Sequence, residues 1–200
     1  MKLLGIDYGT TSVKTALFDE KLNECFSFSQ DYTLTTRGDR VEFKAEKYWE
    51  MLKESIAVVG ENHKIEALAI DSQCETLILT DENGVPVRDA IVWLDNRATL
   101  EAQEIEEKFG RKKVYEVTGQ PEITATWPAC KLLWVKKNEP EVWAKTKKIF
   151  MLEDYLIYKL TGNFAAEKTI QSSTIYFDIR SGDWWDEMLE FIGVSRVQAY

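Results

Sequence analysis

The sequence predicts a mixed α/β layer fold, and the order of its apolar patterns is the reason. Three consecutive strand-like segments open the 200-residue chain, after which helical and strand-like segments alternate. Short apolar runs indicate strands, whereas apolar residues spaced by three and four positions indicate amphipathic helices. Strands followed by such alternation are typical of a sheet covered by helices. We therefore expect a mixed sheet with three leading antiparallel strands and flanking helices.

The three leading strands are expected at 3–8, 13–19 and 24–33. A tight turn of small residues, Gly9–Ser12, separates the first two strands, and 19–23 forms the second turn. Because an apolar run follows Gly9–Ser12 at once, that turn joins two strands of a hairpin and does not lead into a helix. A polar loop then extends through Gly38.

The rest of the chain is expected to alternate between helices and strands. A helix with Trp49 and Leu52 on its apolar face ends at Gly60, where glycine is a common stop. Pro128 suits the first position of a later helix. The expected helices are 45–59, 97–109, 129–137, one beginning at 139–140, 153–160 and one beginning near 184; the expected strands are 65–70, 76–80 and 87–92 (a hairpin joined by 81–84), and 149–151.

Composition excludes several classes of function. The net charge of −9 and the pI near 4.8 argue against general nucleic-acid binding, which requires a basic face. Three cysteines without a C-x-x-C pair suit a reducing compartment and exclude a disulfide framework. The single histidine, His63, argues against a histidine metal site or a Ser-His-Asp triad. Neither a signal peptide nor a long apolar span is found, so we expect a cytoplasmic protein without a membrane anchor.

The first hairpin carries the most informative chemistry. Gly9 allows a close backbone approach, and successive N–H groups in the turn form a concavity suited to an anion. Lys14 adds a positive charge. Asp7 would repel a bare phosphate, so it is best explained as a partner of phosphate-bound Mg²⁺. The pattern is not a Walker A loop. The alternative is an ordinary Gly-Thr hairpin turn with a solvated aspartate.

Two further segments resemble parts of a sugar site. Gln73 and Glu75 follow a predicted strand, where ligand-facing loops are common, and a carboxylate accepts strongly from hydroxyl groups. Trp93 closes an apolar strand with Asp95 and Arg97 just beyond it, which offers an aromatic face beside charged hydrogen-bonding groups. The alternatives are an exposed polar loop for the first segment, and a core tryptophan with a structural Asp–Arg ion pair for the second.

One lysine stands at an unusual place. Lys131 lies near the start of a predicted helix, where the helix dipole does not favour a cation. Either a specific partner holds it or its amine is solvated.

Taken in order, these segments resemble the FGGY family of carbohydrate kinases, which includes xylulokinase and glycerol kinase. One such segment is a weak match, but six in the family's order cover essentially the whole chain. They are GIDYGTTSVK (5–14), SQCET (72–76), AIVWLDNR (90–97), KLLW (131–134), DYLIYKLTG (154–162) and GDWWD (182–186).

The resemblance implies an actin-like, ribonuclease-H-like ATPase domain over residues 1–200, with ATP and Mg²⁺ as cofactors. The residues expected to bind the nucleotide phosphates are Gly9, Thr10, Thr11, Ser12 and Lys14, with Asp7 near the metal. The residues expected in or near the sugar pocket are Gln73, Glu75, Trp93, Asp95 and Arg97. Cys74 departs from the glycerol-kinase pattern, which has an arginine there, and the Met-His of xylulokinases is absent.

The resemblance also implies parts that this sequence does not contain. The family's general-base aspartate lies in a Gly-rich segment that would follow Tyr200, and the second domain would come later still. The chain is thus expected to be an incomplete N-terminal domain, whose partner is its own C-terminal domain. An apolar wall left uncovered would favour self-association, so a homodimer is one expectation.

The expected function is transfer of the ATP γ-phosphoryl group to a hydroxyl of a small sugar, with a pentulose such as xylulose favoured. Residues 1–200 alone are expected to be inactive or nearly so. A glycerol or other polyol kinase of the same family, and a non-catalytic actin-like binding module, are the alternatives.

Overall fold

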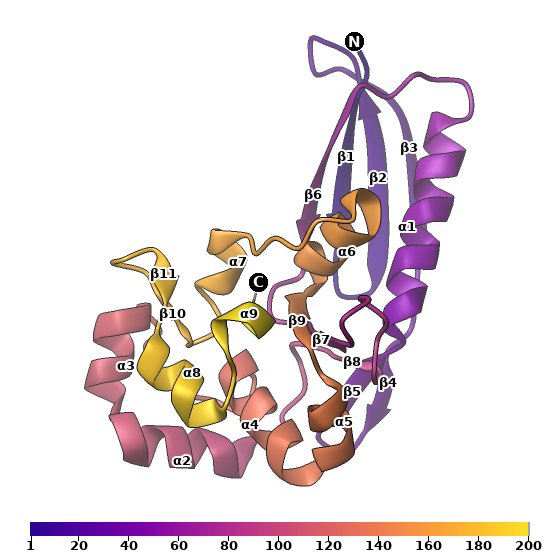
Figure 1. The fold of residues 1–200 in the computed structure, drawn as a ribbon. Helices are drawn as coiled ribbons and strands as arrows, with labels where there is room; N and C mark the ends of the chain where they lie inside the picture. Colours follow the sequence, from indigo (N-terminus) through magenta and orange to yellow (C-terminus); the bar gives the residue numbers. More distant parts are fainter. Residues whose placement is uncertain (200) are drawn as a thin grey trace. The chain divides into compact units, whose positions relative to one another are not determined.

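The computed structural model describes residues 1–199, and the chain forms two compact units (Figure 1). Unit 1 comprises Met1–Leu34 and Lys44–Gln73, and unit 2 comprises Thr35–Phe43 and the chain from Cys74 onward. Each unit has its own sheet, so each is described by itself.

Unit 1 is built on a four-stranded sheet in the order β3-β2-β1-β6. The strands are β1 (Leu3–Tyr8), β2 (Ser12–Phe18), β3 (Glu24–Asp31) and β6 (Ala67–Ser72). The three leading strands are antiparallel to one another, as predicted, and β6 is parallel to β1.

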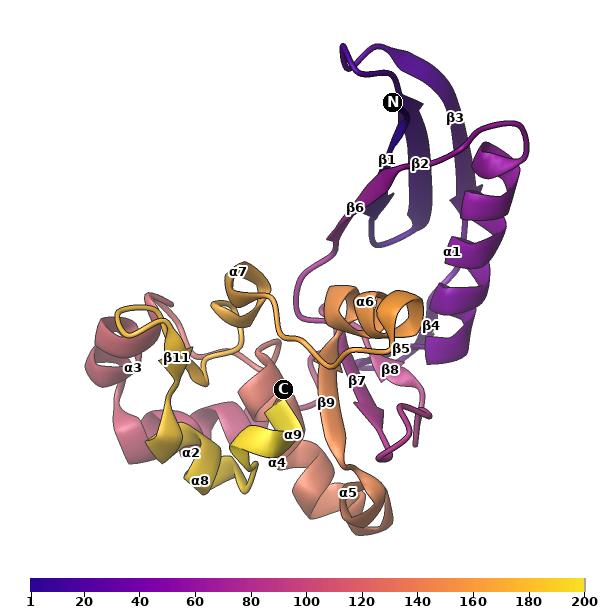
Figure 2. The ribbon, with the colours of Figure 1, turned by 45° about the horizontal axis from the view of Figure 1, so that its top comes forward.

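The core of unit 1 lies between this sheet and helix α1 (Ala45–Gly60). Alternate residues of β1 point into the core, so Leu4 and Tyr8 are buried there. Helix α1 contributes Tyr48 and Leu52, which are also buried. Figure 2 shows α1 running along β3 in this unit.

Unit 2 contains a five-stranded antiparallel sheet in the order β4-β5-β8-β7-β9. The strands are β4 (Thr35–Arg37), β5 (Arg40–Phe43), β7 (Leu77–Thr80), β8 (Ala90–Ile91) and β9 (Lys148–Met151). A second, two-stranded sheet pairs β10 (Phe177–Asp178) with β11 (Asp183–Trp184).

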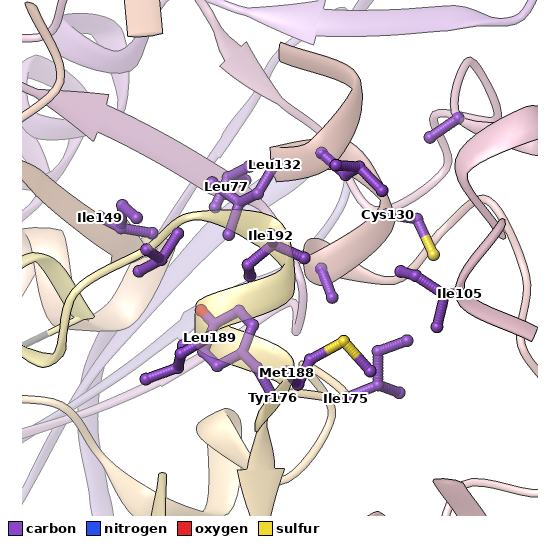
Figure 3. Close-up of a cluster of buried hydrophobic side chains, with 14 of the residues drawn as sticks. Leu77, Ile105, Cys130, Leu132, Ile149, Ile175, Tyr176, Met188, Leu189 and Ile192 are labelled. Carbon is purple, nitrogen blue, oxygen red and sulfur yellow. The ribbon is translucent and has the colours of Figure 1, made fainter. Parts of the chain in front are cut away.

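The helices of unit 2 enclose one large apolar core, part of which Figure 3 shows. Leu132, Met188 and Ile192 come from two of these helices and belong to the same cluster as Leu77 and Ile149 of the sheet. The helices are α2 (Thr99–Phe109), α3 (Arg111–Thr118), α4 (Pro128–Asn138), α5 (Pro140–Lys145), α6 (Leu152–Thr161), α7 (Lys168–Gln171), α8 (Asp186–Ile192) and α9 (Arg196–Ala199).

Most predicted elements are confirmed, and the differences have physical reasons. The polar loop through Gly38 contains the short strand β4, whose three residues are all exposed, and β5 follows it, where only Val41 and Phe43 alternate with charged residues. Of the predicted strand 87–92, only β8 (Ala90–Ile91) is a strand in the structure. A single residue pair joins it to β7. Short elements without a marked apolar pattern escaped prediction: α3, α7, α9, β10 and β11.

Among the described residues, no helix is both long and apolar enough to cross a membrane.

The turn Asp81–Gly84 yields a stability prediction. Gly84 has a φ of 72°, and an added Cβ would lie 2.1 Å from a ring carbon of Tyr158. We expect Gly84→Ala to lower the free energy of unfolding by about 2–4 kcal/mol, because it combines left-handed strain with overpacking. Urea unfolding of the chain measures this loss. Gly38 has a φ of 60° with nothing within 4 Å, so Gly38→Ala is the control and should cost about 1 kcal/mol. Equal losses in the two variants would contradict the overpacking argument.

Candidate active site

The predicted hairpin at the start of the chain is present, and it joins β1 to β2. The last residue pair of the two strands is Tyr8 with Val13, so Gly9–Ser12 lies at the tip. A Cβ built on Gly9 would lie 3.4 Å from the Ser12 carbonyl oxygen and 3.9 Å from Asp7 Oδ1. A side chain at position 9 would therefore occupy the space between the tip and the Asp7 carboxylate, which glycine leaves open.

Asp7 and Lys14 face each other across the hairpin. They are directly paired residues of β1 and β2, and both are exposed. Their side chains lie on the sheet face that does not carry α1, where Gly5, Asp7, Lys14 and Phe18 line a hollow. One carboxylate and one amine thus lie beside the hairpin tip, as the sequence predicts.

Gln73 lies in unit 1 with the hairpin residues. It follows β6, and its backbone N–H donates to the Tyr8 carbonyl oxygen at 2.8 Å. Its side-chain amide donates to the hydroxyl groups of Tyr32 at 3.1 Å and Tyr48 at 3.3 Å. Sequence reasoning placed Gln73 near the sugar and missed both tyrosines as its partners, because no local pattern links positions 32, 48 and 73.

The remaining four predicted sugar residues lie in unit 2. Glu75 has a φ of 65°, which is uncommon and strained for a side chain of this size. Burial raises the pKa of its carboxyl, while the positive charge of Lys131 and a hydrogen bond with Ser173 lower it. A backbone in a costly conformation and a half-buried carboxylate together are features of functional loops.

Lys131 is the buried cation for which the sequence left open a specific partner or solvation. Its side chain is fully buried, and its amine donates to the carbonyl oxygens of Val92 at 3.0 Å and Trp93 at 3.3 Å. Burial lowers the pKa of this amine to about 8, against the opposing effect of Asp95 and Glu75. The unusual position of a cation near a helix start was the signal, and the specific partners are these two carbonyls.

Asp95 and Arg97 form a buried ion pair. Asp95 is completely buried, and its Oδ2 accepts from Arg97 Nη2 at 2.7 Å and from the Val41 N–H at 2.6 Å. Arg97 also donates to Glu42 at 2.7 Å and stacks over the Trp134 ring at 4.9 Å. The structural ion pair that the sequence left open is therefore present, and it ties the loop after Trp93 to β5.

Trp93 differs from this pair in its exposure. The residue is 36% exposed, whereas its carbonyl oxygen accepts a hydrogen bond from the Lys131 amine. An aromatic ring with an accessible face and a fixed backbone suits contact with the C–H face of a sugar.

The buried amine of Lys131 makes stability depend on pH. Between about pH 8 and 10.5 the unfolded chain binds a proton at Lys131 that the native chain does not, so the free energy of unfolding should rise with pH. Lys131→Met removes this contribution. As the pH rises through this window, the free energy of unfolding of wild type should therefore increase relative to that of Lys131→Met, by at most about 1.4 kcal/mol per pH unit.

Urea unfolding at several pH values measures this difference. Lys112 is 90% exposed, so Lys112→Met is the control and should show no such trend. Parallel curves for wild type and Lys131→Met would contradict the prediction.

Comparisons with known proteins agree with this description. Residues 2–198 match the FGGY family of carbohydrate kinases, N-terminal domain. The chain is 32% identical to xylulose kinase of Lactococcus lactis, over 97% of this chain and 40% of that protein, and 33% identical to glycerol kinase of Thermococcus onnurineus, over 97% and 41%. The chain thus spans about two fifths of the length of these curated relatives.

Solved structures confirm the predicted actin-like fold. Gluconate kinase of Lactobacillus acidophilus superposes with a TM-score of 0.93 at 26% identity, covering 99% of this chain and 41% of that one. Ligand-bound xylulose kinase of the same organism gives a TM-score of 0.92 at 26% identity, with the same coverage. The chain belongs to the FGGY family of carbohydrate kinases, and it corresponds to their N-terminal domain.

Proposed function

We propose that residues 1–200 supply the phosphate hairpin and the sugar-recognition residues of an ATP-dependent carbohydrate kinase. The observation that carries the proposal is the family match over residues 2–198, together with a hairpin tip kept open beside one carboxylate and one amine. The proposed reaction moves the γ-phosphoryl group to a hydroxyl of a small sugar, a pentulose such as xylulose. Because ATP is its donor, we place this activity in the cytoplasm.

The hairpin has the donors that a polyphosphate needs. The backbone N–H groups of Thr10, Thr11 and Ser12 would bind phosphate oxygens, and the Lys14 amine would add positive charge. A glycine at position 9 keeps this side of the hairpin open. Its role is to hold the transferred group in place, which is the main contribution a protein makes to phosphoryl transfer.

Asp7 fits a magnesium ion better than a metal held by the protein alone. Among residues 1–199, no three His, Cys, Asp or Glu side chains are grouped to hold a metal. Mg²⁺ commonly takes one or two carboxylates, with phosphate oxygens and waters completing its six ligands. Bound there, the ion would neutralise developing phosphate charge. Asp7 would supply the protein's single carboxylate.

In unit 2, Glu75 and Trp93 are proposed to contact the sugar directly. Glu75 would accept hydrogen bonds from hydroxyl groups, and the exposed face of Trp93 would cover C–H groups. Asp95 and Arg97 already bind each other, so we propose that they fix the loop carrying Trp93. We assign no general base among residues 1–199.

The decisive experiment measures ADP release by the full-length protein with Mg·ATP and a panel of acceptors. Xylulose, ribulose, gluconate and glycerol represent the acceptor types of the relatives. We expect acceptor-dependent ADP release with the highest kcat/KM for a pentulose. Residues 1–200 alone should give none, because they span only about two fifths of the length of the kinase relatives. Full-length protein that releases no ADP with any acceptor would contradict the kinase proposal, and preference for glycerol would contradict the pentulose assignment.

A substitution pair separates the two predicted groups of residues. Glu75→Gln should raise the KM for the sugar about tenfold or more, because it replaces a charged acceptor by a neutral one, and leave the KM for ATP within about twofold. Asp7→Asn should leave the KM for the sugar within about twofold and raise the KM for ATP. It should also raise the Mg²⁺ concentration needed for half-maximal rate. Steady-state kinetics with each ligand varied in turn provide both values. Equal KM changes in both variants for both ligands would contradict the assigned roles.

A further inference from the structure

We propose that Tyr32 and Gln73 are positioning residues that fix the orientation of the Gly9–Thr10 peptide for phosphate binding. The inference rests on the proposed function and deepens it. It assigns Gln73 a role through the hairpin in place of direct contact with the sugar.

Tyr32 holds the hairpin at two points. Its backbone N–H donates to the Thr11 carbonyl oxygen at 2.9 Å, and its hydroxyl donates to the Gly9 carbonyl oxygen. Both contacts are made by one residue that comes directly after β3. The carbonyl groups of Gly9 and Thr11, the residues before and after Thr10, are therefore both hydrogen-bonded to Tyr32.

A held carbonyl fixes the next N–H group. The peptide bond is planar and trans, so the C=O of Gly9 and the N–H of Thr10 point in opposite directions. Because the Gly9 oxygen is turned toward the Tyr32 hydroxyl, the Thr10 N–H is turned away from it. The orientation of this donor is thus set by the fold before a phosphate binds, which reduces the cost of binding.

The Tyr32 hydroxyl is itself held in place. The side-chain amide of Gln73 has two hydrogens, and it donates to the hydroxyls of Tyr32 and Tyr48. A hydroxyl that accepts from Gln73 directs its own single proton to the Gly9 oxygen. Burial raises the pKa of Tyr32, which favours the protonated hydroxyl that donates this bond.

Aromatic packing makes this arrangement stiff. The Tyr32 ring lies 6.0 Å from the ring of Tyr8 and 5.8 Å from that of Tyr48, and the Tyr8 and Tyr48 rings are 5.3 Å apart. The backbone of Gln73 is bound to the Tyr8 carbonyl at 2.8 Å. Three rings and one amide therefore connect α1 and the end of β6 to the hairpin tip.

The experiment compares Tyr32→Phe with Tyr8→Phe in the full-length protein. Tyr8→Phe removes a hydroxyl of the same cluster that donates to the Tyr48 carbonyl at 3.0 Å, whereas the Gly9 carbonyl accepts from Tyr32. We expect Tyr32→Phe to raise the KM for ATP about tenfold, the value of one lost hydrogen bond, and to leave the KM for the sugar within about twofold. Tyr8→Phe should lower the melting temperature about as much as Tyr32→Phe does, but it should leave the KM for ATP within about twofold.

Two further measurements keep the outcomes distinct. Gln73→Met removes the amide that holds Tyr32, and it should raise the KM for ATP at least threefold; it decides the matter if Tyr32→Phe fails to fold. Calorimetry should give a weaker affinity for Mg·ADP in Tyr32→Phe and Gln73→Met than in Tyr8→Phe, the same order as the KM values for ATP. This binding also tests the inference if the wild type proves to have no kinase turnover, a result that counts against the proposed function alone. Equal nucleotide affinities for Tyr32→Phe, Gln73→Met and Tyr8→Phe would overturn the positioning role.

Discussion

The register of β1 between its two neighbours is the constraint on which unit 1 depends. β1 pairs with β2 in the antiparallel sense and with β6 in the parallel sense, so its position is fixed from both sides. A slip by one residue would move Leu4 and Tyr8 out of the core and turn Asp7 into it. In the observed register the core is filled, Asp7 faces outward opposite Lys14, and the hairpin tip falls at Gly9–Ser12. The predicted nucleotide residues are thus placed by the hydrophobic pattern of the strand.

In unit 2, buried charges replace the hydrogen-bond ladder that a longer strand would provide. β8 has only two residues, and the chain then enters the loop that carries Trp93. Asp95, Arg97 and Lys131 are all buried around this loop, and each is paired or hydrogen-bonded. A buried charge without a partner would cost several kcal/mol, so removing one of these three residues should destabilise the loop by leaving its partners unpaired. The same set fixes the backbone of the aromatic residue proposed to contact the sugar.

The local part of this structure could be predicted from sequence, and the long-range part could not. The apolar runs on both sides of Gly9 predicted the first hairpin, and apolar residues spaced by three and four positions predicted α1. Both signals arise from residues close in the sequence. Strand β4 before Gly38 carries no such signal, and β5 after it has only the two alternating apolar residues Val41 and Phe43. The partners of Gln73 come from positions 32 and 48, which no local pattern joins to it. Lys131 was the exception: its unfavourable place near a helix start pointed to a partner before the carbonyls were known.

The passage from unit 1 to unit 2 at Gln73–Glu75 carries a physical consequence. Gln73 is anchored in unit 1 through the Tyr8 carbonyl and two tyrosine hydroxyls. Two residues later, Glu75 has a positive φ that costs of order 1–3 kcal/mol, and the fold of unit 2 must stabilise it. The residue that holds the hairpin and the residue proposed to accept a sugar hydroxyl are therefore fixed by separate cores.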